Sequence, residues 1–175
     1  MVLRKIFLFL VTIFVTFFFY SCGGNAENLI EGNQAPDFSL QDAYGKYFRL
    51  SEYKGISPVV IYFYPKANTP GCTTEACGIR DSFIKFKENN IVVLGISVDS
   101  KESLKEFIDD HNLNFPLLSD ESKNVSEAYG VLNNIGIASR ITFIVDKNGN
   151  IANILRDVEV NTHADDVYKF ASKLK

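Results

Sequence analysis

The feature that most constrains this chain is the passage from an apolar run to a cysteine. Val59–Tyr64 is uninterruptedly apolar, which is typical of a strand buried on both faces of a sheet. Pro65 stops the run, a short polar loop follows, and Cys72 then enters what reads as the first turn of a helix. We therefore expect a central strand that delivers a cysteine to a helix N-terminus.

That setting suggests that Cys72 is a nucleophile. A thiol reacts as its thiolate, and the free N–H groups and dipole at a helix N-terminus lower the pKa of a cysteine placed there. Thr69 can bring a hydroxyl beside the sulfur, and Pro65 and Pro70 stiffen the loop. The alternative is a small buried hydrophobic residue, as most free cysteines are. The polar loop rich in proline and glycine argues against it.

The residues around Cys72 also resemble a known signature. Pro65, Thr69, Cys72 and Glu75 form the pattern P-x-x-x-T-x-x-C-x-x-E, which resembles the active-site signature of the peroxiredoxins. The longer string YFYPKANTPGCTTEAC is similar to the bacterioferritin comigratory protein or peroxiredoxin Q subgroup. The likeness covers nearly all of the chain after about residue 30, because it continues through three further segments: VVLGISVDS, FPLLSD and SRITFIVDKNGNI.

The resemblance implies a hydroperoxide substrate and a role for each site residue. Thr69 and the backbone N–H of Cys72 would bind the peroxide oxygens. Arg140, at the start of a strand expected beside the central one, would keep the sulfur ionised and hold the leaving oxygen. Glu75 would orient that guanidinium through a bidentate pair. From composition alone, Arg140 would be a surface cation and Glu75 a first-turn acid favoured by the helix dipole.

Cys77 follows Cys72 by five residues. In an intact helix from about residue 73, such residues have Cα atoms about 8.6 Å apart and side chains about 140° apart, whereas a disulfide needs about 5.5–6 Å. A bond between them therefore requires the first turns to unwind after Cys72 becomes a sulfenic acid. The resemblance implies that Cys77 is the resolving cysteine. The alternative is a buried structural thiol.

The N-terminal segment reads as an export signal. Arg4 and Lys5 precede an apolar run from residue 6 to 20, which is too short to span a bilayer comfortably. Ser21 and Cys22 followed by two glycines resemble a bacterial lipobox, although Phe19 and Tyr20 depart from the usual residues. We expect a signal at 1–21 and a lipidated Cys22. A signal cut without lipidation and an uncleaved anchor are the alternatives.

The charge, length and cysteine count of the chain after residue 21 limit what kind of domain it can form. Loss of two basic and no acidic residues moves the formal net charge from −3 to −5, which does not suggest nucleic-acid binding. Roughly 150 residues suffice for one domain with a proper core. We expect a polar tether at 22–34 and a single domain at 35–175. Its two cysteines form a pair, which in exported proteins usually indicates a disulfide.

The coarse pattern predicts an α/β fold of thioredoxin type, with a central mixed sheet flanked by helices and an additional N-terminal β-hairpin. Alternation and turn residues predict strands at 37–41, 47–50, 59–64, 91–98, 116–118, 140–146 and 150–158. Helices are predicted at about 73–89, 100–111, 123–129 and 163–174.

Two rival functions remain at this stage. A thioredoxin-like thiol-disulfide oxidoreductase would need C-x-x-C, whereas four residues separate these cysteines. A non-catalytic lipoprotein binding module would need no reactive thiol. His111 and His163 do not stand at ligand spacing with the cysteines, so we expect no metal and no other cofactor. The resemblance to peroxiredoxins implies a monomer that is recycled by thioredoxin or a similar reductant. The lipobox at Cys22 adds the expectation that a lipid on this residue anchors the protein to the outer side of a membrane.

Overall fold

The computed structural model of the chain describes residues 29–174. The predicted signal segment and Cys22 lie outside these residues. Within the described part, no helix is both long enough and apolar enough to cross a membrane.

A seven-stranded mixed sheet forms the centre of the fold, with the order β2-β1-β5-β4-β3-β6-β7. The central strand β3 runs parallel to β4 and antiparallel to β6. β5 continues the parallel part, and the N-terminal hairpin of β1 and β2 joins antiparallel at the β5 edge. The strands are β1 Ser39–Asp42, β2 Tyr47–Arg49, β3 Val59–Phe63, β4 Val92–Ser97, β5 Leu117–Ser119, β6 Ile141–Val145 and β7 Ile151–Leu155.

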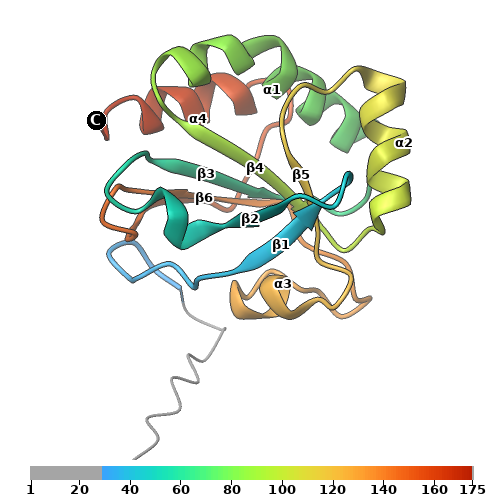
Figure 1. Ribbon diagram of the computed structural model, residues 1–175, viewed down its shortest axis with the longest axis horizontal. Coiled ribbons are helices and arrows are strands. Elements are labelled where there is room, and N and C mark those ends of the chain that lie inside the picture. The colour runs from blue at the N-terminus through green and yellow to red at the C-terminus, as the bar shows by residue number, and fades with distance from the viewer. Residues whose placement is uncertain (1–28, 175) are drawn as a thin grey trace, which may run out of the picture.

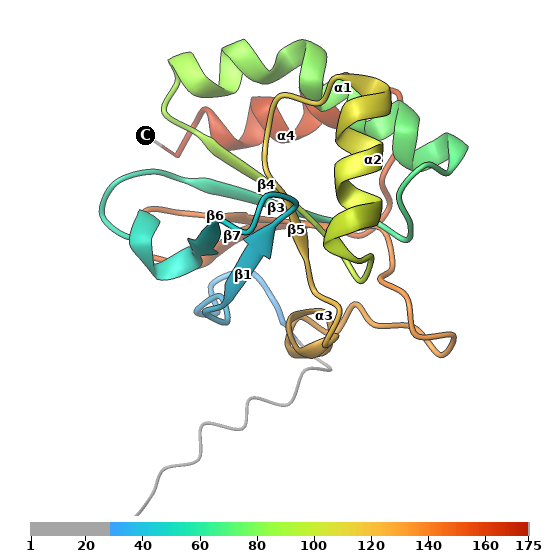
Figure 2. The same ribbon diagram turned by 45° about the vertical axis from the view of Figure 1, so that its right-hand side comes forward.

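Helices cover both faces of this sheet. Figure 1 shows α1 and α4 side by side over one face and α3 on the opposite side, and Figure 2 shows α2 beside the α1 layer. The first face is thus covered by three helices, and the second by α3, a 3-10 turn and the N-terminal segment. The helices are α1 Pro70–Glu88, α2 Lys101–His111, α3 Asn124–Ala128 and α4 His163–Ala171, and the 3-10 turn is Leu50–Tyr53.

The central strand carries both halves of the core. All five residues of β3 are buried, and successive side chains point to opposite faces. Val60 and Tyr62 pack under α1, α2 and α4, whereas Ile61 and Phe63 pack on the other face. The prediction of a strand buried on both sides is confirmed. The loop that leads to Cys72 leaves the carboxyl end of this rigid strand.

The predicted fold class is confirmed, and the differences lie at element ends. One of them is the start of α1, which begins at Pro70 rather than near residue 73. Proline suits the first helical position because its fixed φ fits a helix and its missing N–H would have no partner there. β7 and α4 each end three residues earlier than predicted.

The described fold also extends to the N-terminal side of residue 35. Gly32 N–H donates to the carbonyl of Ile151, and Ile151 N–H donates to the carbonyl of Asn33, each at 2.8 Å. Gln34 forms an isolated antiparallel bridge with Asn150. These bonds attach the last residues of the predicted tether to the start of β7.

Candidate active site

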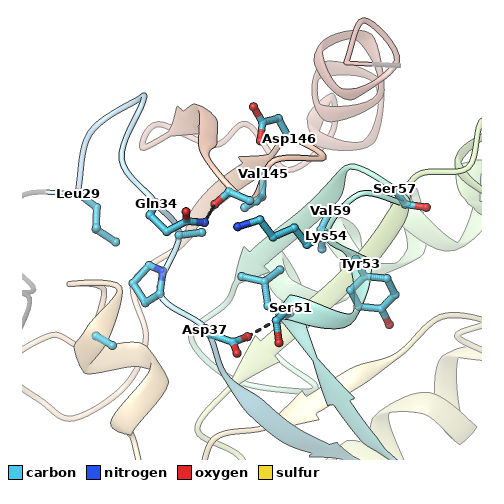
Figure 3. A pocket seen from close by; sticks show the side chains of 15 residues that line it. Leu29, Gln34, Asp37, Ser51, Tyr53, Lys54, Ser57, Val59, Val145 and Asp146 are labelled. Carbon is cyan, nitrogen blue, oxygen red and sulfur yellow. Dashed lines mark hydrogen bonds between the residues drawn. The ribbon is translucent and has the colours of Figure 1, made fainter. Parts of the chain in front are cut away.

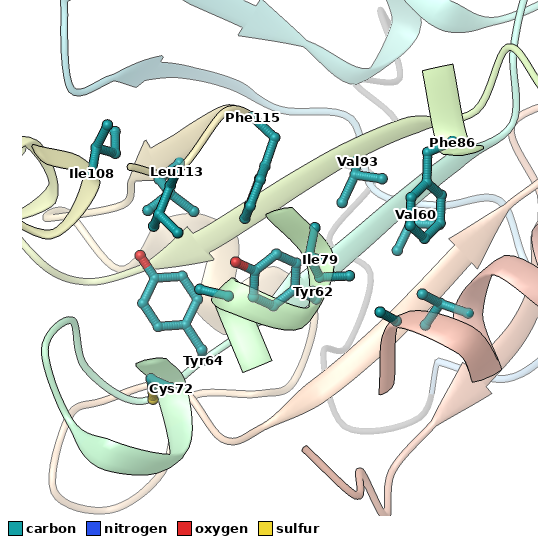
Figure 4. Close-up of a cluster of buried hydrophobic side chains, with 14 of the residues drawn as sticks. Val60, Tyr62, Tyr64, Cys72, Ile79, Phe86, Val93, Ile108, Leu113 and Phe115 are labelled. Carbon is teal, nitrogen blue, oxygen red and sulfur yellow. The ribbon is translucent and has the colours of Figure 1, made fainter. Parts of the chain in front are cut away.

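Cys72 lies in the first turn of α1, directly after the loop that leaves β3. Thr69 is the N-cap with an extended backbone, and Pro70 occupies the first helical position. N–H groups in a first turn have no acceptor within their own helix, so the Cys72 N–H is available to an oxygen that approaches the sulfur. The cysteine is only 2 % exposed, and Figure 4 shows it at the margin of the apolar cluster, next to Tyr64.

Arg140 joins Cys72 to a buried carboxylate. Its Nη2 lies 3.3 Å from Cys72 Sγ, and its Nη1 donates to Glu75 Oε2. Arg140 reaches this position from the residue before β6, the strand that pairs with β3. The predicted grouping of Cys72, Arg140 and Glu75 is therefore present, with a permanent cation at the sulfur.

The approach of Arg140 depends on a residue that the sequence reasoning treated only as part of the loop. A Cβ placed on Gly71 would lie 3.2 Å from Arg140 Nη2, which is tighter than an ordinary van der Waals contact. Glycine at this position lets the guanidinium sit over the first turn of α1, where it reaches the sulfur.

Glu75 is completely buried, and its environment acts on its charge in two directions. Burial outweighs the opposing effect of Arg140 and raises the pKa of Glu75 to about 7. The pKa of Arg140 is raised, because Glu75 and Cys72 together outweigh the effect of burial. The guanidinium thus stays charged beside the sulfur, and Arg140 offsets part of the effect of burial on the Glu75 charge.

His163 belongs to the same cluster, although sequence reasoning gave it no role. At the start of α4 it is 1 % exposed, and its Nδ1 lies 3.0 Å from Glu75 Oε1. Its Nε2 lies 2.8 Å from the hydroxyl of Thr142 on β6. No local pattern signals this contact, because it exists only where α4 packs on α1.

The loop before Cys72 is held by two neighbours. The Ala67 N–H donates to Asp99 Oδ2 at 2.8 Å, and Ser97 Oγ donates to the same oxygen at 2.9 Å. Asn68, which adopts a positive φ of 57°, has its Oδ1 3.1 Å from His111 Nε2 at the end of α2. Both anchors were missed from the sequence, and they fix the loop from the ends of β4 and α2.

The remaining predicted residues lie nearby without touching the sulfur through a hydrogen bond. The Thr69 hydroxyl donates to the carbonyl of Lys66 at 2.9 Å, and among the described residues no hydrogen bond joins it to Cys72. Pro65 lies in the bend after β3. Cys77 is half-buried farther along α1, and both cysteines are free thiols. The described residues contain no cluster of three or more His, Cys, Asp or Glu side chains that could hold a metal.

A separate cavity of about 700 Å³ opens away from these residues. It is lined by the N-terminal segment, the 3-10 turn and the β6–β7 turn, with Leu29, Asp37, Val59 and Asp146 among its walls (Figure 3). None of the residues around Cys72 lines it, so it has no part in the chemistry at that sulfur.

Comparison with known proteins identifies the family of this chain. A family model described as "AhpC/TSA family" matches residues 31–154. The chain is 41% identical over 141 residues to peroxiredoxin Bcp of Escherichia coli K12, covering 77% of this chain and 90% of the relative. It is 43% identical over 139 residues to peroxiredoxin Bcp of Bacillus subtilis 168, covering 75% and 88%.

Solved structures give the same result. The crystal structure of peroxidoxin BcpB from Mycobacterium tuberculosis superposes with a TM-score of 0.79 at 31% identity, covering 85% of this chain and 99% of that one. A sulfur, a cation and a carboxylate meet at one end of a peroxiredoxin-type sheet, and the family model spans most of the sequence. The chain therefore belongs to the AhpC/TSA family, with Bcp and peroxiredoxin Q proteins among its relatives.

Proposed function

We propose that this protein is a thiol peroxidase that reduces hydrogen peroxide and organic hydroperoxides at Cys72. One observation carries the proposal: Arg140 Nη2 lies 3.3 Å from Cys72 Sγ in the first turn of a helix. A fixed cation and free backbone N–H groups favour the thiolate and meet the charge that develops on a peroxide. The relatedness to peroxiredoxins supports the same activity.

The first step is a displacement at oxygen. The Cys72 thiolate attacks one peroxide oxygen, the O–O bond breaks, and the sulfur is oxidised by two electrons to a sulfenic acid. The other oxygen leaves as hydroxide or alkoxide and takes a proton to give water or an alcohol. Arg140 lies where negative charge spreads over sulfur and oxygen in this transition state, and fixed donors are most effective there.

Cys77 completes the cycle in this proposal. Its thiolate attacks the sulfur of the Cys72 sulfenic acid, the S–O bond breaks, and hydroxide leaves and takes up a proton to give water, so that a disulfide remains within α1. Since the two residues lie on an intact helix, their Cα atoms are about 8.6 Å apart by helix geometry, and the bond needs about 5.5–6 Å. The turns that contain residues 72–77 therefore unwind before the bond forms.

The contacts of α1 support an unwinding that stops soon after Cys77. Arg80 donates from Nη1 to the carbonyl of His111 at 2.7 Å, and its own carbonyl accepts from Asn114 at 3.2 Å. These bonds attach the helix to the end of α2 from residue 80 onward. Between Cys72 and Arg80, Gly78 is the residue with the lowest helix propensity, and it directly follows Cys77.

The rival functions fit this site less well. A thiol-disulfide oxidoreductase that works through two cysteines in one turn would have no use for a cation and a buried carboxylate at one sulfur. A non-catalytic binding module would gain nothing from a partly buried Arg140–Glu75 pair beside a free thiol, because taking charges out of water costs free energy.

A turnover assay tests the activity. The domain from residue 29 onward should consume hydrogen peroxide with a dithiol reductant such as thioredoxin, and Cys72→Ser should consume none. After one equivalent of peroxide, mass spectrometry should find a Cys72–Cys77 bond in the wild type and a Cys72 sulfenic acid in Cys77→Ser. Peroxide consumption that survives in Cys72→Ser would overturn the proposed activity, and a stable sulfenate in the wild type would remove Cys77 from it.

We also propose that the chain is exported, anchored through a lipid on Cys22 and monomeric. The apolar run before Ser21-Cys22-Gly-Gly supports the anchor, and a resolving cysteine in the same helix as Cys72 supports a monomer. Cys22→Ala should release processed protein from the membrane fraction. If this variant stays membrane-bound and unprocessed, the segment is an uncleaved anchor.

A further inference from the structure

Two buried polar atoms face each other behind the Arg140–Glu75 pair. Glu75 Oε1 and His163 Nδ1 lie 3.0 Å apart, and both side chains have no exposed surface. Within residues 29–174, neither atom makes a hydrogen bond, and each faces the other at this distance. A buried polar atom without a partner costs free energy, so each of these two atoms depends on the other.

The proton in this contact can be placed. Burial and, to a smaller extent, Arg140 lower the pKa of His163 to about 4, so the imidazole is neutral near neutral pH. A neutral ring carries one N–H, and the atom that faces a carboxylate has to be the donor. In this tautomer the ring presents its Nδ1–H to Glu75 Oε1, and Nε2 accepts from the hydroxyl of Thr142 at 2.8 Å.

We propose that His163 is a positioning residue for the Cys72 thiol, acting through Glu75 and Arg140. The inference rests on the proposed peroxidase function, and it adds to the site two residues from other elements, His163 on α4 and Thr142 on β6. Four groups form one continuous chain of contacts from the sulfur: Arg140, Glu75, His163 and Thr142.

The two carboxylate oxygens of Glu75 explain how His163 influences the position of Arg140. Oε2 accepts from Arg140 and Oε1 lies against His163, so the carboxylate cannot rotate without losing one partner. Without the His163 N–H, Oε1 would be buried with no donor facing it, which favours the protonated acid. A protonated Glu75 binds the guanidinium less strongly, and Arg140 then has less to hold it against the sulfur.

Other charged or titratable groups near His163 leave Glu75 as its partner. The ring of Tyr62 on β3 packs edge-on at 5.8 Å, and burial raises the pKa of this phenol well above its usual value, so it is neutral. Asp166 on α4 raises the pKa of His163, in opposition to the larger effects of burial and Arg140, and it accepts a hydrogen bond from the Thr162 hydroxyl. Arg140 repels a protonated imidazole.

The test compares two replacements of His163 in the reduced chain. His163→Leu removes the donor, and His163→Asn keeps an amide N–H close to the position of Nδ1. We expect His163→Leu to raise the pH at which Cys72 is half-alkylated by iodoacetamide by about one unit, a tenfold change in ionisation. It should also slow oxidation of Cys72 by peroxide on the order of tenfold, and His163→Asn should recover most of both losses.

Two further variants separate positioning from general stability. Val167→Ala, a buried position on the same helix, should lower the free energy of unfolding and leave the alkylation profile of Cys72 unchanged. Thr142→Val removes the hydroxyl at Nε2 with little change of shape, and it should shift the profile upward by less than His163→Leu.

The outcomes are distinct. If His163→Leu folds and its alkylation profile matches the wild type, the histidine only fills space and the inference is wrong. If His163→Leu does not fold, an unchanged profile in Thr142→Val overturns the inference instead. Alkylation needs no peroxide, so a failure of the peroxidase proposal would appear separately, as absent turnover in the wild type.

Discussion

Replacing Gly78 with alanine tests whether α1 unwinds between Cys72 and Cys77 during turnover. Gly78 lies in the helix one residue after Cys77 and two before Arg80, whose bonds to the end of α2 mark where unwinding should stop. A Cβ at this position would lie 3.8 Å from the Cβ of Ala164 on α4, an ordinary van der Waals contact. The alanine therefore fits the folded protein without strain.

The size of the effect follows from the cost of glycine in a helix. Alanine stabilises a helix interior by about 0.5–1 kcal/mol relative to glycine. This gain exists in the intact α1 and is lost where residue 78 leaves the helix or becomes the cap of a shortened one, a position that glycine accepts better than alanine. The unwound form should therefore be about two- to fivefold less populated in Gly78→Ala.

The assay separates the two chemical steps. Reduced protein is mixed with one equivalent of peroxide, and samples are quenched over time with dimedone, which traps the sulfenic acid. Formation of the Cys72 sulfenic acid should proceed at the wild-type rate, and its conversion into the disulfide should slow about two- to fivefold. Excess peroxide should therefore produce more sulfinic acid in Gly78→Ala than in the wild type.

Ser82→Ala is the matched control. It raises helix propensity by about half a kcal/mol in the same helix, beyond the Arg80 anchor. It should stabilise the protein and leave the rate of disulfide formation unchanged. The reasoning is refuted if Gly78→Ala raises the free energy of unfolding but forms the disulfide as fast as the wild type.

Three further predictions concern the cluster at the sulfur. Gly71→Ala should displace the Arg140 guanidinium by a few tenths of an ångström and slow Cys72 oxidation by roughly threefold to tenfold, measured by peroxide consumption in single turnover. Arg140→Lys keeps the charge but cannot bridge sulfur and carboxylate, so the same rate should fall on the order of 100-fold. In urea unfolding, the raised pKa of Glu75 contributes stability that is present below pH 4.5 and lost as pH rises through about 7. The lowered pKa of His163 contributes stability that is present above pH 6.5 and lost as pH falls through about 4. The free energy of unfolding of Glu75→Gln, relative to the wild type, should therefore increase as pH rises from 4.5 to 7. That of His163→Leu, relative to the wild type, should decrease as pH rises from 4 to 6.5.

The sequence predicts those parts of the fold that local patterns determine. The apolar run at β3 fits a strand covered on both faces, and the Asn- and Gly-rich turn at 147–150 brings β6 and β7 together as a hairpin. The Ser100 cap of α2 is present, with its hydroxyl accepting from the Ser103 N–H. The start of α1 was placed too late because Pro70 was assigned to the loop rather than to the first helical position.

The site is only partly contained in local sequence. Cys72 and Glu75 are one helical turn apart, so their shared face follows from spacing, and Arg140 follows from the resemblance. His163 could not be inferred in the same way, because its contact with Glu75 depends on how α4 crosses α1. The same holds for Asp99, which fixes the loop through a hydrogen bond that spans 32 residues.

The rate of the first oxidation of Cys72 tests the central claim most directly. In a Cys77→Ser background, the second-order rate constant with hydrogen peroxide is measured for the native protein and for the same chain unfolded in urea, with dimedone labelling of Cys72 as the readout. The account predicts that the native sulfur reacts about a hundredfold faster or more, because Arg140 and the first turn of α1 are in place only in the fold. Equal rate constants in the native and unfolded chains would contradict it.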